Sequence, residues 1–267
     1  LMIGIFYFTQ DVASLNMASY LKEEYSFRES STNGRRCFSD GKACIFETNK
    51  SLLELDNLDE YGLDLIYFLS KHSSAQGISA FTTHPTGNWT NEARLGGKPY
   101  ELSYSAPLEM LELLRNLKKP NVDGIEVSYE ATHHGPLLKT PSLFVEIGGN
   151  PSTIENKEYA KIVGKAMHDT LYKEDIEFNK VVIGIGNTHY PMRFTRLALE
   201  KGYAFAHMIP KYAIEDNGSN FFMLGQAMER SKDKVEGAII DWKSLNSEAR
   251  SKAIAKLNEL GLDYERA

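Results

Sequence analysis

Short apolar runs alternate along the chain with longer stretches in which apolar residues recur every three to four positions. The short runs have strand length, and they predict strands at Met2–Phe8, Asp64–Leu69, Ile78–Thr83, Gly124–Thr132, Ser142–Ile147, Val181–Gly186, Ala204–Met208 and Gly237–Asp241. The longer stretches predict helices at Leu108–Leu117, Glu155–Glu174, Met192–Lys201 and Ser247–Leu260. This alternation is typical of an α/β protein with a mostly parallel mixed sheet and helices on both faces.

Residues with special backbone preferences mark several ends of these elements. Gly202 and Gly261 follow predicted helices and are expected to cap them in the left-handed conformation. Ser152 and Glu155 have the spacing of a capping box, and Asp40-Gly41 between apolar runs predicts a hairpin turn. No linker rich in Pro, Gly or Ser divides the 267 residues, so we expect a single domain over 1–267.

Charge and cysteine content narrow the class of protein. Thirty basic and 36 acidic residues give a net charge of -6, which disfavours a protein that coats DNA or a membrane surface but permits a local basic groove for one RNA end. No apolar run approaches the roughly 18 residues that span a bilayer, and no secretion signal precedes the first strand. We therefore expect a cytoplasmic protein, with Cys37 and Cys44 as reduced thiols.

The strongest chemical signal is a repeated ending of the predicted strands. Three of them run into Thr83-His84-Pro85, Thr132-His133-His134-Gly135-Pro136 and Thr188-His189-Tyr190-Pro191, and a fourth exits into Lys71-His72-Ser73-Ser74. Because the carboxyl ends of parallel strands meet at one edge, we expect these histidines to share a crevice.

Histidines gathered in a crevice serve metal ligation or proton transfer. Together with one carboxylate they form the nitrogen-and-oxygen set of a catalytic zinc site: His84, His133, His134, His189 and Glu146. Strand alternation separates His133 from His134, but this rule loosens at a strand end. None of the spacings is a known zinc motif, so histidines that only cap carbonyls are the structural alternative. His207, inside an apolar run, is expected to be a core histidine with satisfied hydrogen bonds.

Other segments suggest substrate contacts. Gly148-Gly149 lies between a strand and a helix, where free N–H groups attract an anion or oxyanion, although a plain tight turn explains it nearly as well. Trp89 has the chemistry to stack a base, and Arg94 and Lys98 on the same loop to contact phosphates. Lys71, His72 and Arg193 are expected near the same rim, although each cation alone is more often a solvated charge.

At these residues the chain resembles the archaeal and plant type of D-aminoacyl-tRNA deacylase. The matching segments are Asp11–Asn16, Ser70–Ser74, Thr83–Trp89, Glu130–Pro136 and Gly184–Pro191. The resemblance runs over nearly the whole chain. It implies one α/β domain related in architecture to peptidyl-tRNA hydrolases and purine nucleoside phosphorylases, dependence on zinc, and hydrolysis of the ester between a D-amino acid and the 3′ end of tRNA.

Residue chemistry then assigns roles within that reaction. His84, His133, His189 and Glu146 are expected to bind zinc, while Glu130 or His134 transfers the proton. We expect a monomer that acts on D-aminoacyl-tRNA and binds neither DNA nor membranes. Two other classes stay open: a metal-free enzyme like purine nucleoside phosphorylase, and a non-catalytic module that binds an RNA end or a nucleotide.

Overall fold

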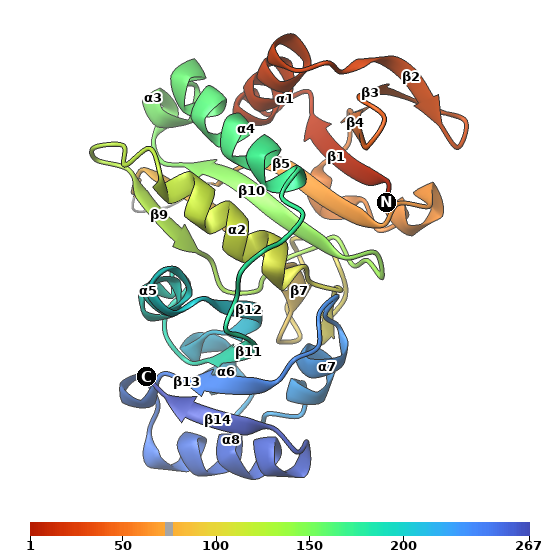
Figure 1. Ribbon diagram of the computed structural model, residues 1–267. Coiled ribbons are helices and arrows are strands. Elements are labelled where there is room, and N and C mark those ends of the chain that lie inside the picture. The colour runs from red at the N-terminus through yellow and green to blue at the C-terminus, as the bar shows by residue number, and fades with distance from the viewer. Residues whose placement is uncertain (73–76) are drawn as a thin grey trace.

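A large and a small β-sheet, a short two-stranded pair and their helices form the structure, a computed structural model that describes residues 1–72 and 77–267 (Figure 1). Ser73 and Ser74, which belong to the fourth predicted strand exit, lie outside the described residues. The helices are α1 (Val12–Glu24), α2 (Pro107–Lys118), α3 (Pro151–Ile154), α4 (Lys157–Leu171), α5 (Met192–Lys201), α6 (Lys211–Asp216), α7 (Leu224–Glu229) and α8 (Ser247–Glu259). Short 3₁₀ turns are η1 (Leu52–Glu54), η2 (Leu58–Tyr61) and η3 (Trp242–Ser244).

The large sheet has the strand order β2-β3-β4-β1-β5-β10-β6-β9. Its strands are β1 (Ile3–Phe8), β2 (Arg28–Thr32), β3 (Arg35–Ser39), β4 (Ala43–Thr48), β5 (Leu65–His72), β6 (Ala80–His84), β9 (Glu126–Tyr129) and β10 (Ser142–Gly148). Strands β4, β1, β5 and β10 are parallel to their neighbours in this group, whereas β6 is antiparallel to β10 and parallel to β9. The sheet is therefore mixed, and its direction reverses between β10 and β6.

The small sheet has the order β12-β11-β13-β14, and all of its neighbours are parallel. Its strands are β11 (Lys180–Ile185), β12 (Tyr203–Ile209), β13 (Gly237–Ile240) and β14 (Asp263–Arg266), and a separate short pair is formed by β7 (Gly87–Asn88) and β8 (Glu101–Leu102). Because every strand here runs the same way, all four carboxyl ends lie at one edge.

The two faces of the large sheet are covered differently. On one face, residues such as Tyr67 and Leu69 pack in the main apolar core with side chains of α1, α2 and α4. On the other face, Phe68 and Phe144 belong to a second cluster closed by η1 and η2. Alternate residues of a strand point to opposite faces, and the helices α1, α2 and α4 pack on the first face. Near the ends of β5 and β10, the second face is therefore not covered by these helices. That is where the polar site lies.

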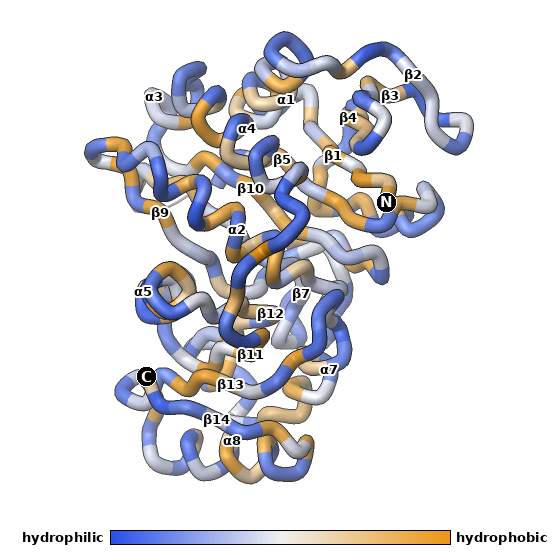
Figure 2. The backbone as a smooth tube through the Cα atoms, in the orientation of Figure 1, coloured by the Kyte–Doolittle hydropathy of each residue, from blue (hydrophilic) through white to orange (hydrophobic). Residues whose placement is uncertain are grey.

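One continuous apolar core joins the two sheets, since it contains buried residues of both, among them Ile147 and Ile183. Hydrophobic residues gather along strands such as β10 and β13 (Figure 2). Among the described residues, no helix is long and apolar enough to cross a membrane. These observations confirm the α/β fold with a large, mostly parallel mixed sheet and flanking helices.

Several local predictions are confirmed and one is wrong. Met192–Lys201 is helical with the bounds expected, Gly202 and Gly261 have positive φ angles, and β3 and β4 form the hairpin around Asp40-Gly41. Cys37 and Cys44, on β3 and β4, are buried free thiols. The capping box is wrong, because the helix expected from Glu155 starts only at Lys157 and is capped by the side chain of Asn156.

Candidate active site

Polar side chains form a row across three strands on the less covered face of the large sheet. Glu146 on β10 pairs in register with Ser70 on β5 and with Thr82 on β6. Paired residues of neighbouring strands share a face, so the strands also bring His84 and His72 to the side on which Glu146 lies. The apolar Phe144 lies directly opposite His84, and the two rings stack at 5.1 Å between centroids.

The histidines were expected to meet where the carboxyl ends of parallel strands share an edge, and this is wrong for the large sheet. The carboxyl ends of β6 and β9 do not meet those of β5 and β10, because the strand pairs run in opposite directions. His84 therefore reaches Glu146 across the sheet face instead of at a shared edge. The edge argument holds for the small sheet, where the exits of β11 and β12 carry His189 and Tyr212.

The segment after β9 brings both of its histidines to the same place. The strand ends at Tyr129, three residues earlier than expected, because the next backbone groups bind the small sheet: Ala131 N donates to His189 O and Thr132 N to Met208 O. His134 has a φ angle of 42°, so strand alternation no longer separates it from His133.

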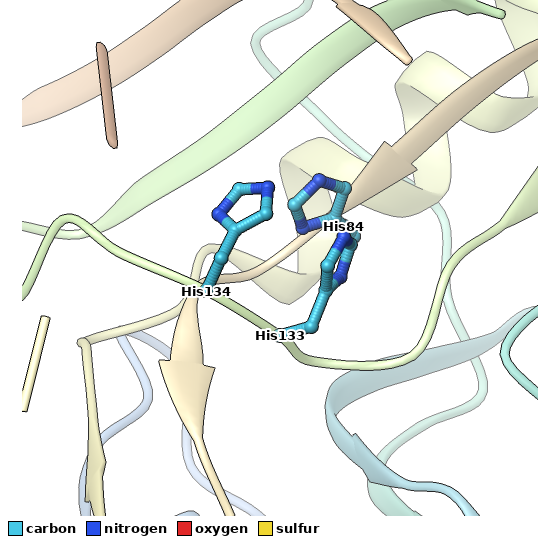
Figure 3. Close-up of side chains that lie close together, drawn as sticks. All are labelled: His84, His133 and His134. Atoms are coloured by element: carbon cyan, nitrogen blue, oxygen red, sulfur yellow. The ribbon is translucent and has the colours of Figure 1, made fainter. Parts of the chain in front are cut away.

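Three histidine rings, those of His84, His133 and His134, face one another (Figure 3). The centroid distances are 4.1 Å between His84 and His133, 4.2 Å between His133 and His134, and 4.9 Å between His84 and His134. Each Nδ1 lies within hydrogen-bond distance of a backbone carbonyl: Pro85 O at 3.0 Å, Ala131 O at 2.8 Å and Gly135 O at 2.6 Å, in that order. A carbonyl only accepts, so each Nδ1 donates and each Nε2 is left for another partner.

Glu130 lies at the centre of a second group. Its Oε2 is 2.8 Å from Nε2 of His189 and 3.1 Å from Nδ1 of His72, and Nε2 of His133 is 3.6 Å away. Its Oε1 accepts a hydrogen bond of 2.6 Å from the hydroxyl of Thr82. The fully buried carboxylate is thus held on both oxygens.

Glu146 and His84 leave hydrogen-bonding capacity unused. Glu146 Oε2 is 3.7 Å from His84 Nε2 and 3.5 Å from His72 Nδ1, and within the described residues neither Glu146 Oε2 nor His84 Nε2 has a hydrogen-bond partner. Buried polar atoms without a partner are rare because each one costs free energy. Both atoms belong to groups whose donor atoms lie within 4.8 Å of one another and that suit a metal ion: His84/His133/His134 and His84/Glu130/Glu146, with His72/Glu130/His189 as a third.

The charges in the cluster are distributed unevenly. Burial opposes ionisation of Glu130, but hydrogen bonds with His189 and His72 hold its pKa well below the usual value, and His72 and His84 likewise lower the pKa of Glu146. Burial disfavours the charged form of His72 too, but the two carboxylates raise its pKa to about 10. Burial and the neighbouring His84 lower the pKa of His133 far below normal and that of His134 to about 4. The neutral imidazoles of His133 and His134 therefore lie beside the buried carboxylates of Glu130 and Glu146, whose negative charge needs a positive charge nearby.

Two cavities open onto the cluster from different sides. The larger, about 860 Å³, is lined by Asp11, Lys71, His72 and Tyr190 among others, and the smaller, about 590 Å³, by Trp89, Glu92, Tyr212 and Asp216 among others. Both are also lined by Leu95, His133, His134 and His189. An extended substrate could therefore pass the histidines with one part in each cavity.

Comparison with known proteins identifies the family of the chain. The family model described as D-aminoacyl-tRNA deacylase matches residues 59–265. The chain belongs to the D-aminoacyl-tRNA deacylase family. The D-aminoacyl-tRNA deacylase of Thermococcus onnurineus is 37% identical over 266 residues, covering 96% of each chain, and that of Pyrococcus furiosus is 36% identical over 264 residues, covering 95% of this chain and 96% of the relative. A crystal structure of a conserved protein of unknown function has 30% identity and a TM-score of 0.90, covering 100% of this chain and 95% of the other.

In this member of the deacylase family, the residues predicted for zinc and proton transfer all lie in one cluster: His84, His133, His134, His189, Glu130 and Glu146. His72, predicted to contact substrate, lies among them and bonds to Glu130. Lys71 is exposed and lines the larger cavity, while its backbone N–H donates to Asp11.

The residues of the loop that was predicted to bind RNA lie in different surroundings in the structure. Trp89 is 3% exposed and donates from Nε1 to Met208 O at 3.2 Å, so it forms a cavity wall and is not the free stacking platform that the sequence suggested. Arg94 is exposed, lines the smaller cavity and pairs with Glu92 at 2.9 Å. Lys98 is exposed on the same loop.

Three further predicted contacts lie apart from the two cavities. Gly148 and Gly149 line neither of them; a side chain on Gly148 would press on His72, and Gly149 has a φ angle of 139° beside Ser79 and Thr153. The tight turn is therefore the better explanation of this glycine pair, and the oxyanion role is not supported. Arg193 pairs with Asp241 at 3.6 Å and lines a separate small cavity.

Four residues that position the cluster were not assigned a role from the sequence. Thr82 bonds Glu130, Tyr190 bonds Nε2 of His72, and the Tyr212 hydroxyl is 3.4 Å from Nδ1 of His189. Asp11 caps α1 and accepts from Lys71 N. The signal for Thr82 was its position two residues before His84 on a strand, which places it on the same face.

Proposed function

We propose that this protein hydrolyses the ester bond between a D-amino acid and the 3′ end of tRNA. The observation that carries the proposal is the unused Nε2 of the buried His84, which lies with His133 and His134 beside two buried carboxylates, in a chain of the D-aminoacyl-tRNA deacylase family. Ester hydrolysis needs an activated water and a group that takes its proton, and these residue types supply both. Family membership also disfavours the nucleoside phosphorylase and the non-catalytic binding module.

The residues fit zinc as the resident metal. His133 and His134 are neutral at pH 7, and their Nδ1 atoms are held by carbonyls, which is how zinc-binding histidines are commonly oriented. The partnerless atoms His84 Nε2 and Glu146 Oε2 would both gain a partner, and the cation would balance the carboxylates.

We assign His84, His133 and His134 to the zinc, with Glu146 beside them. Lewis acidity, which activates water as a nucleophile near neutral pH, is the chemistry that zinc supplies when bound. In this assignment His134 is a ligand, because its Nδ1 is held by Gly135 O and it offers a ring nitrogen within 4.8 Å of those of His84 and His133. His189, expected from sequence as a ligand, instead holds Glu130.

Glu130 is then the residue that accepts the proton of the attacking water. Thr82 donates to Oε1, and we assign the proton transfer to Oε2, which His189 and His72 hold and which lies 3.6 Å from Nε2 of His133. The same Oε2 returns the proton to the departing 3′ oxygen of the ribose. His72 and His189 keep the carboxylate ionised between turnovers.

The substrate is proposed to lie across both cavities, with its ester at the histidines they share. Lys71 on one side and Arg94 with Lys98 on the other are exposed cations in reach of RNA phosphates. The proposal includes a cytoplasmic location, where charged tRNA is used. It also takes the monomer as the working unit.

The decisive test is turnover of D- and L-tyrosyl-tRNA by the metal-loaded protein, with and without a chelator. We expect release of D-tyrosine only, loss of activity with the chelator, and recovery on addition of Zn²⁺. Equal rates on both enantiomers would indicate an unspecific esterase. Full activity in a protein shown to contain no metal would overturn the zinc assignment while leaving the deacylase itself.

A further inference from the structure

The carboxyl edge of the small sheet continues from the active site to a cluster of cations. The exits of β12 and β11 carry Tyr212 and His189, which contact each other at the site. The exits of β13 and β14, next along the same edge, carry Trp242 and Arg266. Neighbouring strands are about 4.8 Å apart, so β14 is about 10 Å from β11.

Two arginine side chains pack against the ring of Trp242 at this edge. The guanidinium of Arg266 lies 3.9 Å from the centre of the Trp242 ring and that of Arg250 lies 4.8 Å from it, while Arg250 Nε donates to Trp242 O at 2.9 Å. Lys243 follows in sequence and is exposed. Cation–π contacts orient the arginines without neutralising them.

Helix α5 adds to the same surface. Its Arg193 and Arg196 line a cavity of about 150 Å³ together with Arg266, and the chain end marked C lies beside α5 (Figure 1). This helix begins three residues after His189. Only the short segment from His189 to Met192 therefore separates the active site from the helix that carries part of the basic surface.

Two of the carboxylates nearby lie close to a basic group. Asp241 pairs with Arg193 at 3.6 Å, and Glu265 pairs with Lys180 at 3.4 Å and accepts from the Tyr203 hydroxyl at 2.7 Å. In contrast, within residues 1–72 and 77–267 no ion pair joins a carboxylate to Arg196, Lys243, Arg250 or Arg266. On a chain of net charge -6, this leaves a local excess of positive charge.

The geometry points to this edge as the surface that binds the phosphate backbone of the tRNA acceptor end. The inference rests on the proposed function, which places the 3′ end of tRNA beside His189. The strand behind that end must leave the site, and the edge offers planar guanidinium groups suited to phosphate, held in place by an aromatic ring. Arg193 therefore belongs to recognition of the tRNA body, away from the reacting ester.

The test compares two substrates for one double variant, Lys243→Gln with Arg266→Gln. D-tyrosyl-tRNA uses the whole surface, whereas 3′-O-D-tyrosyl-adenosine has no phosphate. For the tRNA we expect KM to rise about tenfold with kcat unchanged, and the plot of log(kcat/KM) against log salt to flatten by about 1.4–1.8, because two phosphate contacts are lost. For the small ester, both constants should equal those of wild type.

A matched control removes two exposed lysines from the helix-covered side, Lys118→Gln with Lys173→Gln, at the same change in net charge. It should behave as wild type on both substrates. An edge variant with the wild-type salt slope on tRNA, or one equally impaired on the small ester, would overturn the inference. If wild type hydrolysed neither ester, the proposed function would fail, and binding of uncharged tRNA by wild type and edge variant would still decide whether this surface holds RNA.

Discussion

His84 in the large sheet and His207 in the small sheet are both strand residues with 0% exposure, yet their surroundings differ completely. Nδ1 of His207 is 3.2 Å from the Thr132 hydroxyl and its Nε2 is 3.0 Å from Arg230 O, so both ring nitrogens are bonded. Only Nδ1 of His84 is bonded, and its Nε2 faces a carboxylate at 3.7 Å. Burial alone therefore does not mark a functional histidine; unused bonding capacity beside buried charge does.

The pKa values of His207 and His84 are shifted in opposite directions. Burial lowers the pKa of His207 to about 4, so the ring stays neutral in a neutral environment. Burial acts in the same direction on His84, but Glu146 and Glu130 outweigh it and raise the pKa. One histidine is part of the core, as its apolar sequence predicted, and the other faces two buried carboxylates.

The largest expected effect comes from His84→Ala, with His207→Ala as the matched truncation. Loss of His84 removes a proposed zinc ligand, so zinc content should fall and deacylation should drop to the uncatalysed level. His207→Ala should keep zinc and kcat, because His207 touches neither cavity. Metal analysis and turnover of both proteins, after circular dichroism has shown them folded, make the comparison. A His84→Ala protein that kept both its zinc and full activity would contradict the assignment of His84 as a zinc ligand.

The next largest effect is expected for Glu130→Gln. The amide keeps the shape and the Thr82 hydrogen bond but cannot accept the proton, so kcat should fall about 10²–10⁴-fold while zinc stays bound. Single-turnover rates and metal stoichiometry measure this. If zinc were lost along with activity, Glu130 would be a ligand, and the group His72/Glu130/His189 would be the metal site instead.

The substitution His207→Gln measures how much His207 contributes to the stability of the core. The change disturbs two buried hydrogen bonds without a compensating partner, so it should lower the free energy of unfolding by about 1–3 kcal/mol. Urea denaturation at pH 7 measures the loss. An equal fall in kcat of the folded protein would show that His207 supports the site as well as the core.

The smallest expected effect is a pH dependence that belongs to His207. Its folded-state pKa of about 4 lies below the unfolded value of 6.5, so the unfolded state binds the proton first, and stability is lost as pH falls from about 6.5 to 4. Between pH 7 and pH 5 this contributes about 2 kcal/mol of destabilisation. In His207→Gln that component should be absent, so the two proteins should become more alike in unfolding free energy at pH 5 than at pH 7. Parallel loss in both would assign the dependence to other groups.

The candidate site was predictable to the extent that residue type reveals chemistry. The side chains of the Thr-His endings and of Glu130 do lie together, as residue type suggested, although His84 reaches the cluster across the sheet face and not at the shared edge that was expected. Trp89 is buried and not free to stack a base, because a tryptophan in a polar loop has the same sequence signature whether it faces solvent, a cavity or the core.

By itself, the sequence determined the family and those strands and helices that have a clear apolar period, and glycines follow the ends of α5 and α8. Helix α1 and the largely exposed strands β2 and β14 were not predicted. Only the tertiary structure decided which residues meet. The reversal of direction between β10 and β6 puts His84 against Glu146, and the bonds from Ala131 and Thr132 to the small sheet turn His133 and His134 to the same side. Strand direction and register depend on contacts between residues some 60 positions apart, such as Thr83 and Phe144, and such contacts leave no local pattern in the chain.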